Sequence, residues 1–327
     1  MKILIIGSKD RYDIFDPEIE VKKNAELVFA DRGTPDDALL AAGADADVLF
    51  ADAISPVSRY LIENMPQLKL INSEGVAYDR IDLAAAKERG IFVCNNKGCN
   101  AGAVAEHTIF LMLGLLRNAV EGQEAVIAGN QIRMKERRMA EGIIELSECS
   151  VGLYGFGDIA KAAAKRLAPF GCRVYYTARS RRDAETEKEY NVTWLSPDEL
   201  IRTCDFISLH TDVNPETRGL VDGAFLSKMR PEAMLVNTSR GELVDNQALR
   251  AALLSGRIAG FAADTIAPEP VTADNPLVAL PPEIMKKVFY SPHLGGITAG
   301  TFRRAHCMMW ENAARIEAGE MPQNRVF

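Results

Sequence analysis

The sequence predicts an α/β protein built from two doubly wound parallel sheets, and three observations support this fold class. Apolar runs of strand length alternate with helical segments in both the early and the later part of the chain. A glycine turn at 155–160 stands between one such strand and one such helix. The length of 327 residues is enough for two domains that each bury a core.

The first 100 residues read as the smaller α/β domain. Its strands are expected at 2–7, 48–51, 68–72 and 91–94, and its helices at 35–42, 56–65 and 82–88. The loop 72–79 follows a strand, and ligands of open parallel sheets bind at such ends. Gly75 in this loop leaves backbone N–H groups free to face a small carboxylate. A plain turn explains the loop equally well.

The segment 151–182 has the size and order of one βαβ unit. Gly155 permits a tight turn, Gly157 permits close approach of a pyrophosphate, and Ala160 permits close helix-to-strand packing. The helix amino terminus then offers N–H groups and a positive dipole to an anion. The pattern predicts a dinucleotide site against the alternative of an ordinary strand-to-helix turn. Its residues are Gly155, Phe156, Gly157, Asp158 and Ile159.

The end of the second strand of this unit bears on the choice of cofactor. NAD sites usually place Asp or Glu about 20 residues beyond the glycines, whereas this chain has Ala178 and then Arg179. A guanidinium suits the 2′-phosphate of NADP, so we expect NADP, with NAD as the alternative cofactor. Arg179 is the expected principal contact, with Ser180 beside it and Arg181 or Arg182 secondary. The alternative is a solvated basic turn.

Polar residues also follow the later strands of this domain. They are His210 and Thr211, the run 237–241, Asp264, and the run 291–296. In a doubly wound sheet such ends line one crevice, which holds the cofactor. An apolar segment at 101–116 is too short and too polar for a membrane span and reads as a buried helix, whose His107 is expected to be structural. The charged segment 118–149 is either an exposed helix or an arm on a second subunit.

Composition excludes several classes of protein. The net charge of -7 and the pI near 5.3 argue against nucleic-acid or anionic-membrane binding. The six cysteines lack paired spacing and are expected to be reduced core thiols, and no His/Cys cluster supports a metal. Met1-Lys2 leads directly into an apolar run without a signal peptide, so a cytoplasmic location is expected.

Six motifs, read together, carry a family resemblance. They are GVAYDRIDLAAAKERGI at 75–91, AVAEHT at 103–108, the glycine turn, LVNTSRGELVD at 235–245, DTIAPEP at 264–270 and SPHLGGIT at 291–298. With them the chain resembles the D-isomer-specific 2-hydroxyacid dehydrogenases, the group that includes D-3-phosphoglycerate dehydrogenase and glyoxylate/hydroxypyruvate reductase. The motifs span most of the chain in the family's order.

The resemblance implies a Rossmann cofactor domain at 101–296, inserted into a smaller, flavodoxin-like substrate domain at 1–100 plus 297–327. It implies a catalytic triad of Arg240, Glu269 and His293, with the substrate carboxylate held around Val76 and Ala77. It also implies a homodimer. The remaining expected cofactor contacts are Val104, His210, Thr211, Thr238, Ser239, Asp264, His293, Gly295 and Gly296.

General chemistry supports the triad roles. His293 can supply a proton near neutral pH, and Glu269 would stabilise the imidazolium. The planar guanidinium of Arg240 can bind and orient an α-keto acid. We therefore expect an NAD(P)-dependent oxidoreductase that transfers a hydride between the cofactor and a small D-specific 2-hydroxy or 2-keto acid. A dinucleotide-sensing binding or co-repressor protein on the same fold is the alternative. Two departures from the family pattern, Lys97 and Asp212, leave the substrate open.

Overall fold

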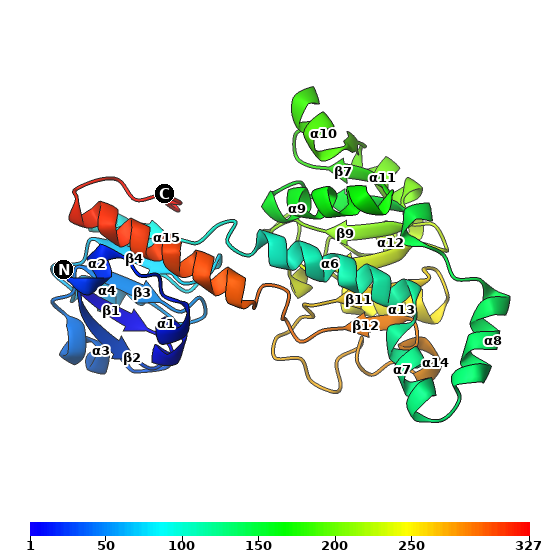
Figure 1. The fold of residues 1–327 in the computed structure, drawn as a ribbon, viewed down its shortest axis with the longest axis horizontal. Helices are drawn as coiled ribbons and strands as arrows, with labels where there is room; N and C mark the ends of the chain where they lie inside the picture. The colour runs from blue at the N-terminus through cyan, green and yellow to red at the C-terminus, as the bar shows by residue number, and fades with distance from the viewer. The chain divides into compact units, whose positions relative to one another are not determined.

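A computed structural model describes all residues from Met1 to Phe327. The chain forms two compact units (Figure 1). The first contains Met1–Asn100 and Ile297–Phe327, and the second contains Ala101–Gly296.

The first unit is a five-stranded parallel sheet with the order β2-β1-β3-β4-β5. This order is the flavodoxin-like one that the sequence analysis expected. Its strands are β1 (Lys2–Ile6), β2 (Glu26–Ala30), β3 (Val48–Ala51), β4 (Leu70–Ser73) and β5 (Phe92–Cys94). Its helices are α1 (Lys9–Phe15), α2 (Glu20–Lys23), α3 (Asp36–Gly43), α4 (Arg59–Glu63), α5 (Leu83–Glu88) and the long α15 (Ala299–Glu317).

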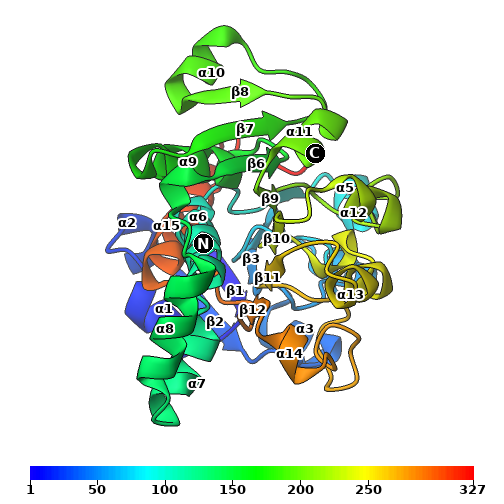
Figure 2. The same ribbon diagram turned by 90° about the vertical axis from the view of Figure 1, so that its right-hand side faces the viewer.

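The second unit is a seven-stranded parallel sheet with the order β12-β11-β10-β9-β6-β7-β8, visible edge to edge in Figure 2. The order reverses beside β6, the strand that enters the glycine turn, as in dinucleotide-binding sheets. Its strands are β6 (Ser150–Tyr154), β7 (Arg173–Thr177), β8 (Val192–Trp194), β9 (Phe206–Leu209), β10 (Met234–Asn237), β11 (Gly260–Ala263) and β12 (Val288–Tyr290).

Helices cover this second sheet. The buried helix α6 (Ala101–Leu116) packs beside α9 (Asp158–Leu167), as Figure 1 shows. The others along the sheet are α10 (Ala184–Tyr190), α11 (Pro197–Thr203), α12 (Gly223–Lys228), α13 (Asn246–Leu254) and α14 (Pro282–Met285).

Two further helices, α7 (Ala119–Ile127) and α8 (Gln131–Glu141), project from the body of the second unit in both views (Figures 1 and 2). Neither buries a single residue. No single helix is long and apolar enough to cross a membrane. Taken together, α6 and α7 have the length and the apolar composition of a membrane span, but the chain bends by 58° between them.

Local capping explains where the structure departs from the expected elements. The helix expected at 56–65 begins only at Arg59, because the Ser58 hydroxyl accepts the Leu61 N–H as an N-cap. Asp82 likewise caps α5 through the Ala85 N–H. The sequence analysis missed α1 and β2: α1 has seven residues and buries only Tyr12, and β2 lies at the sheet edge and is only partly buried.

One close contact in the second unit gives a stability prediction. A Cβ on Gly114 of α6 would overlap the ring of Phe289 in β12. We expect Gly114→Ala to lower the free energy of unfolding by about 1–3 kcal/mol, through overpacking, although Ala favours helix. Gly122→Ala on α7, where a Cβ meets nothing within 4 Å, is the control and should be neutral or stabilising. Urea unfolding of both variants measures this, and equal stability of the two would contradict it.

Candidate active site

The glycine turn after β6 has the shape that a pyrophosphate requires. Gly155 has φ +102°, and a Cβ there would overlap the carbonyl of His210, so only glycine fits. A Cβ on Gly157 would meet no other atom within 4 Å, so the space beside this residue is open to a ligand. No side chain caps the amino terminus of α9, so its first N–H groups are free for an anion. These residues fit a bound dinucleotide.

The arginines after β7 divide into free and engaged side chains. Arg181 makes two bonds to Glu187, at 2.8 and 2.9 Å. Arg182 donates to the Phe156 carbonyl at 3.2 Å, which ties this loop to the glycine turn. Arg179 is exposed and makes no ion pair within the chain. The expected secondary role of Arg181 is therefore weakened, because its charge is already neutralised by Glu187.

The ends of β9 and β10 are joined by side-chain hydrogen bonds. Ser239 Oγ donates to the Thr211 carbonyl at 2.6 Å, and Thr238 Oγ1 lies 2.9 Å from Thr108 Oγ1 on α6. His210 bonds Ser208 Oγ through Nε2 at 2.9 Å, and burial lowers its pKa to about 4. A neutral imidazole at this point can accept or donate a hydrogen bond without adding charge.

His293 and Glu269 form a direct pair. His293 Nδ1 lies 3.1 and 3.0 Å from the two carboxylate oxygens of Glu269. Because an ionised carboxylate only accepts, Nδ1 carries a proton and Nε2 is left for a reacting group. His293 has φ 56°, and the only other non-glycine residues with positive φ are three asparagines. Such a backbone is uncommon for a residue with a Cβ and costs free energy, so the surrounding loop has to hold it.

Asp264 holds that loop in place. It is 4% exposed and accepts from Ser291 Oγ at 2.6 Å and from the Leu294 and Gly295 N–H groups, both at 2.8 Å. Burial opposes ionisation, but these bonds and His107 hold the pKa of Asp264 well below its usual range. The sequence analysis expected Asp264 and Gly295 to contact the cofactor. In the structure the Gly295 N–H and both Asp264 oxygens make hydrogen bonds within the chain, so the Gly295 N–H is unavailable to a cofactor.

Arg240 follows β10 and keeps its guanidinium free of carboxylates. Its only side-chain bond is to the Ser239 carbonyl at 2.9 Å, and its own carbonyl accepts from Asn237 Nδ2. A Cβ on the next residue, Gly241, would overlap the backbone of Ala267. Gly241 therefore lets the loop that carries Arg240 approach the loop that leads to Glu269, a requirement that the sequence analysis did not find.

The loop after β4 in the first unit presents free amides. Asn95 Nδ2 donates to the Val76 carbonyl at 2.7 Å, and Ser73 Oγ donates to the Ala77 carbonyl at 2.6 Å. The N–H groups of Val76 and Ala77 make no hydrogen bond within the chain. Gly75 is not in the left-handed region, so its need is space, because a Cβ would lie 2.7 Å from Ala53 Cβ.

The remaining predicted cofactor residues belong to the same second unit. The side chains of Val104 and Phe156 are buried, so Phe156 can meet a cofactor only through its backbone. Asp158 and Ser180 are exposed, and Ile159 and Gly296 are partly exposed. Ser291, His107 and Gly241 lie in the motifs of the sequence analysis, which expected His107 to be structural. Their particular partners were not predicted, because those partners are distant in sequence.

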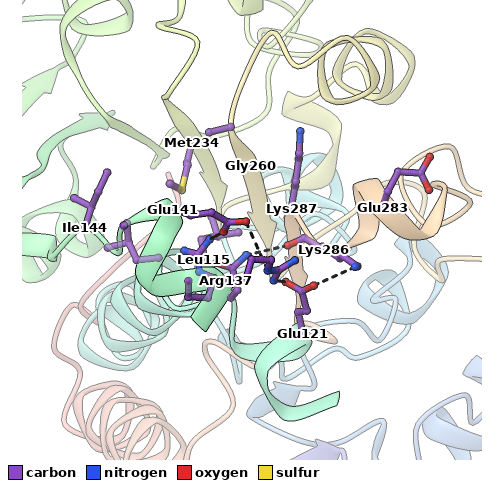
Figure 3. A pocket seen from close by; sticks show the side chains of 15 residues that line it. Leu115, Glu121, Arg137, Glu141, Ile144, Met234, Gly260, Glu283, Lys286 and Lys287 are labelled. Carbon is purple, nitrogen blue, oxygen red and sulfur yellow. Dashed lines mark hydrogen bonds and ion pairs between the residues drawn. The ribbon is translucent and has the colours of Figure 1, made fainter. Parts of the chain in front are cut away.

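A cavity of about 350 Å³ lies elsewhere, beside the projecting helices (Figure 3). Met234 and Gly260 in its wall begin β10 and β11, so it opens at the amino edge of the sheet, opposite to the triad. Glu121 pairs there with Arg137 and Lys286, as the dashed lines show. These ion pairs fasten α7 and α8 to the body, and the cavity is separate from the candidate active site.

The fold and the site together define a nicotinamide-dinucleotide oxidoreductase of the two-domain α/β class. The sequence profile described as "D-isomer specific 2-hydroxyacid dehydrogenase, NAD binding domain" matches residues 109–295. A glyoxylate reductase of Aeropyrum pernix is 34% identical over 89% of this chain and 86% of its own, and one of Thermococcus litoralis is 33% identical over 94% and 92%. The solved TT0316 protein of Thermus thermophilus superposes with a TM-score of 0.82 at 29% identity, over the whole of both chains.

The chain belongs to the D-isomer specific 2-hydroxyacid dehydrogenase family. It is an NAD(P)-dependent oxidoreductase of 2-hydroxy and 2-keto acids, as the sequence analysis expected.

The close approach at Gly241 gives a prediction for this site. Gly241→Ala should displace the backbone at Ala267 and with it Glu269, and we expect kcat to fall roughly 10²-fold, the cost of a misplacement near 1 Å. Gly223→Ala on α12, where a Cβ meets nothing within 4 Å, is the matched control. Dinucleotide affinity measured by fluorescence should be kept in both. A Gly241→Ala enzyme with wild-type kcat would contradict this role of the glycine.

Proposed function

We propose that the chain is a D-specific 2-keto acid reductase in which Arg240, Glu269 and His293 are the catalytic residues. The observation that carries the proposal is the pair between His293 Nδ1 and Glu269, on a loop fixed by buried Asp264. A dinucleotide-sensing protein would have no need of a carboxylate-paired imidazole on a strained backbone. The pair therefore favours catalysis over the binding-protein alternative.

Each member of the triad has one task. His293 holds a proton on Nε2 for the keto oxygen, and Glu269 stabilises the imidazolium and fixes its orientation. Arg240 binds the carboxylate and carbonyl of the keto acid through its unpaired guanidinium. A bound nicotinamide dinucleotide supplies the hydride.

The substrate class follows from the loop after β4 and from the relatives. We assign the carboxylate to the free N–H groups of Val76 and Ala77, which suits a compact 2-keto acid. Several relatives are named glyoxylate reductases, so glyoxylate leads the candidate substrates. A panel of 2-keto acids with NADPH and NADH tests the assignment, and no turnover with any acid would overturn it.

His293→Ala removes the proposed acid. We expect turnover to fall roughly 10²- to 10⁴-fold, the usual contribution of a general acid, while dinucleotide affinity stays nearly unchanged. Steady-state kinetics and cofactor titration measure the two quantities. If His293→Ala keeps the wild-type kcat, His293 is not the acid.

We further propose that the chain prefers NADP, with Arg179 as the principal contact to the 2′-phosphate. Arg179 is an unpaired arginine at the end of β7, and the Arg182 bond to Phe156 keeps this loop beside the glycine turn. Ala178 offers no carboxylate to repel the phosphate.

Cofactor preference is measured as the ratio of kcat/KM for NADPH and NADH. A hydrogen bond to a charged group contributes about 1.5–3 kcal/mol, so Arg179→Ala should reduce the ratio by roughly 10- to 100-fold. Ala178→Asp should reduce it further by repelling the phosphate. Arg181→Ala is the matched control, because Glu187 already neutralises that arginine, and it should leave the ratio nearly unchanged. Wild-type preference for NADH would contradict the proposal.

A homodimer is the proposed assembly. The projecting helices and the segment after them expose large apolar side chains that a partner could cover. These are Val120, Val126, Ile127, Ile132, Met139, Ile143 and Ile144. The proposed location is the cytoplasm, where the six free cysteines would stay reduced.

A further inference from the structure

His306 on α15 is fully buried and lies between two carboxylates of the first unit. Its Nδ1 is 2.7 Å from Asp16 Oδ1, and its Nε2 is 3.0 Å from Glu74 Oε1. His306 is 0% exposed, and Glu74 is 6% exposed. Neither residue belongs to the triad or to the expected cofactor contacts.

The geometry fixes the protonation state of this histidine. An ionised carboxylate has no proton to donate, so each ring nitrogen has to be a donor, which only the imidazolium allows. Burial by itself favours the neutral ring, but the bonds to Asp16 and Glu74 outweigh it and raise the pKa of His306 above 6.5.

Other charged groups around His306 favour the same state. Arg11 Nη2 lies 2.8 Å from both Glu74 Oε2 and Asp52 Oδ2, so a cation pairs with each of these carboxylates. From α2, Lys22 lies 2.9 Å from the other oxygen of Asp16. The Tyr12 ring is 4.5 Å from the imidazole, and burial raises the pKa of its phenol, so it stays neutral. Arg32 pairs with Asp52 at the outer end of the network.

Glu74 connects this buried cluster to the substrate loop. It is the first residue after β4, and its carbonyl accepts from Asn96 Nδ2 at 3.0 Å. Val76 and Ala77, with their free N–H groups, follow within three residues. The same helix reaches the strand before the loop, where Asn312 Nδ2 donates to Asn72 Oδ1 at 2.8 Å. Helix α15 therefore bonds both Asn72 in β4 and Glu74 at the start of this loop.

We propose that His306 is a positioning residue for the substrate carboxylate: its imidazolium binds Glu74 and thereby fixes the Val76 and Ala77 amides. The inference rests on the proposed function for its catalytic consequence. Its structural consequence, an ordered loop, needs no substrate.

The first test is a pH titration of the wild-type protein by nitrogen-15 NMR. The chain has four histidines, so His306→Gln identifies the resonance by its loss. We expect both ring nitrogens to be protonated at pH 7 and the midpoint to lie above 6.5. Because this folded-state pKa is raised, the contribution to stability is complete at low pH and is lost as pH rises through the midpoint. A neutral ring at pH 7 would overturn the proposal.

The second test measures loop order without substrate. Backbone order parameters at Gly75–Ala77 should fall from about 0.85 to below about 0.6 in His306→Gln. Met309→Leu, an equally buried and volume-conserving change on the same helix, should leave them unchanged. If His306→Gln does not fold, Glu74→Gln serves instead, and in the wild type the loop should loosen above the His306 midpoint. An ordered loop in a folded variant would overturn the proposal.

The kinetic test separates this inference from the proposed function. His306→Gln should raise KM for the keto acid roughly 10- to 100-fold while the Kd for the dinucleotide is unchanged, since the expected cofactor residues belong to the second unit. If the wild type reduces no keto acid, the proposed function fails, and the two NMR tests still decide the role of His306. A wild-type KM in His306→Gln, with active wild type, would overturn the positioning role alone.

Discussion

Parallel pairing of every strand is the constraint on which both halves of this protein depend. Because neighbouring strands run the same way, each sheet has one edge at which every strand ends and a loop begins. In the second unit this edge gathers the glycine turn, Arg240 and His293 from β6, β10 and β12. In the first unit it gathers the loops after β3 and β4. Groups far apart in sequence thus come to the same edge of a sheet.

At both edges a buried acid holds the loop of a proposed site residue. Asp264 gathers the Ser291 hydroxyl and two backbone N–H groups under His293. Glu74 accepts from His306 and Arg11 under the Val76 and Ala77 amides. A buried carboxylate is costly unless it is fully bonded, and here each is satisfied by several donors. The hydrogen bonds that offset the cost of burying each carboxylate also hold the loop in position. The same bonds therefore determine both the electrostatics and the geometry of the site.

Charge is distributed unequally among similar side chains. Of the arginines after β7, Arg181 pairs with Glu187 and Arg182 donates to a carbonyl, whereas Arg179 makes neither kind of bond. Arg240 is likewise free of carboxylates, while Arg11 and Arg137 are engaged in ion pairs. A guanidinium is available to a substrate or cofactor only where the fold places no Asp or Glu side chain against it. Sequence counts of basic residues do not reveal this difference.

The sequence by itself determined the fold class, the family and the glycine turn, and it supplied the residues of the proposed triad, because these depend on local patterns such as apolar periodicity and motifs at strand ends. It missed β2 and α1, and it gave free backbone N–H groups as the reason for Gly75, whereas the structure also shows a need for space beside Ala53. Three contacts were decided only by the tertiary structure. The Gly295 N–H donates to Asp264, and the backbone of Ala267 lies against Gly241. His306 bonds both Asp16 and Glu74. Those roles depend on contacts between residues 26 to 290 positions apart, from Gly241 and Ala267 to His306 and Asp16, and no local pattern encodes them.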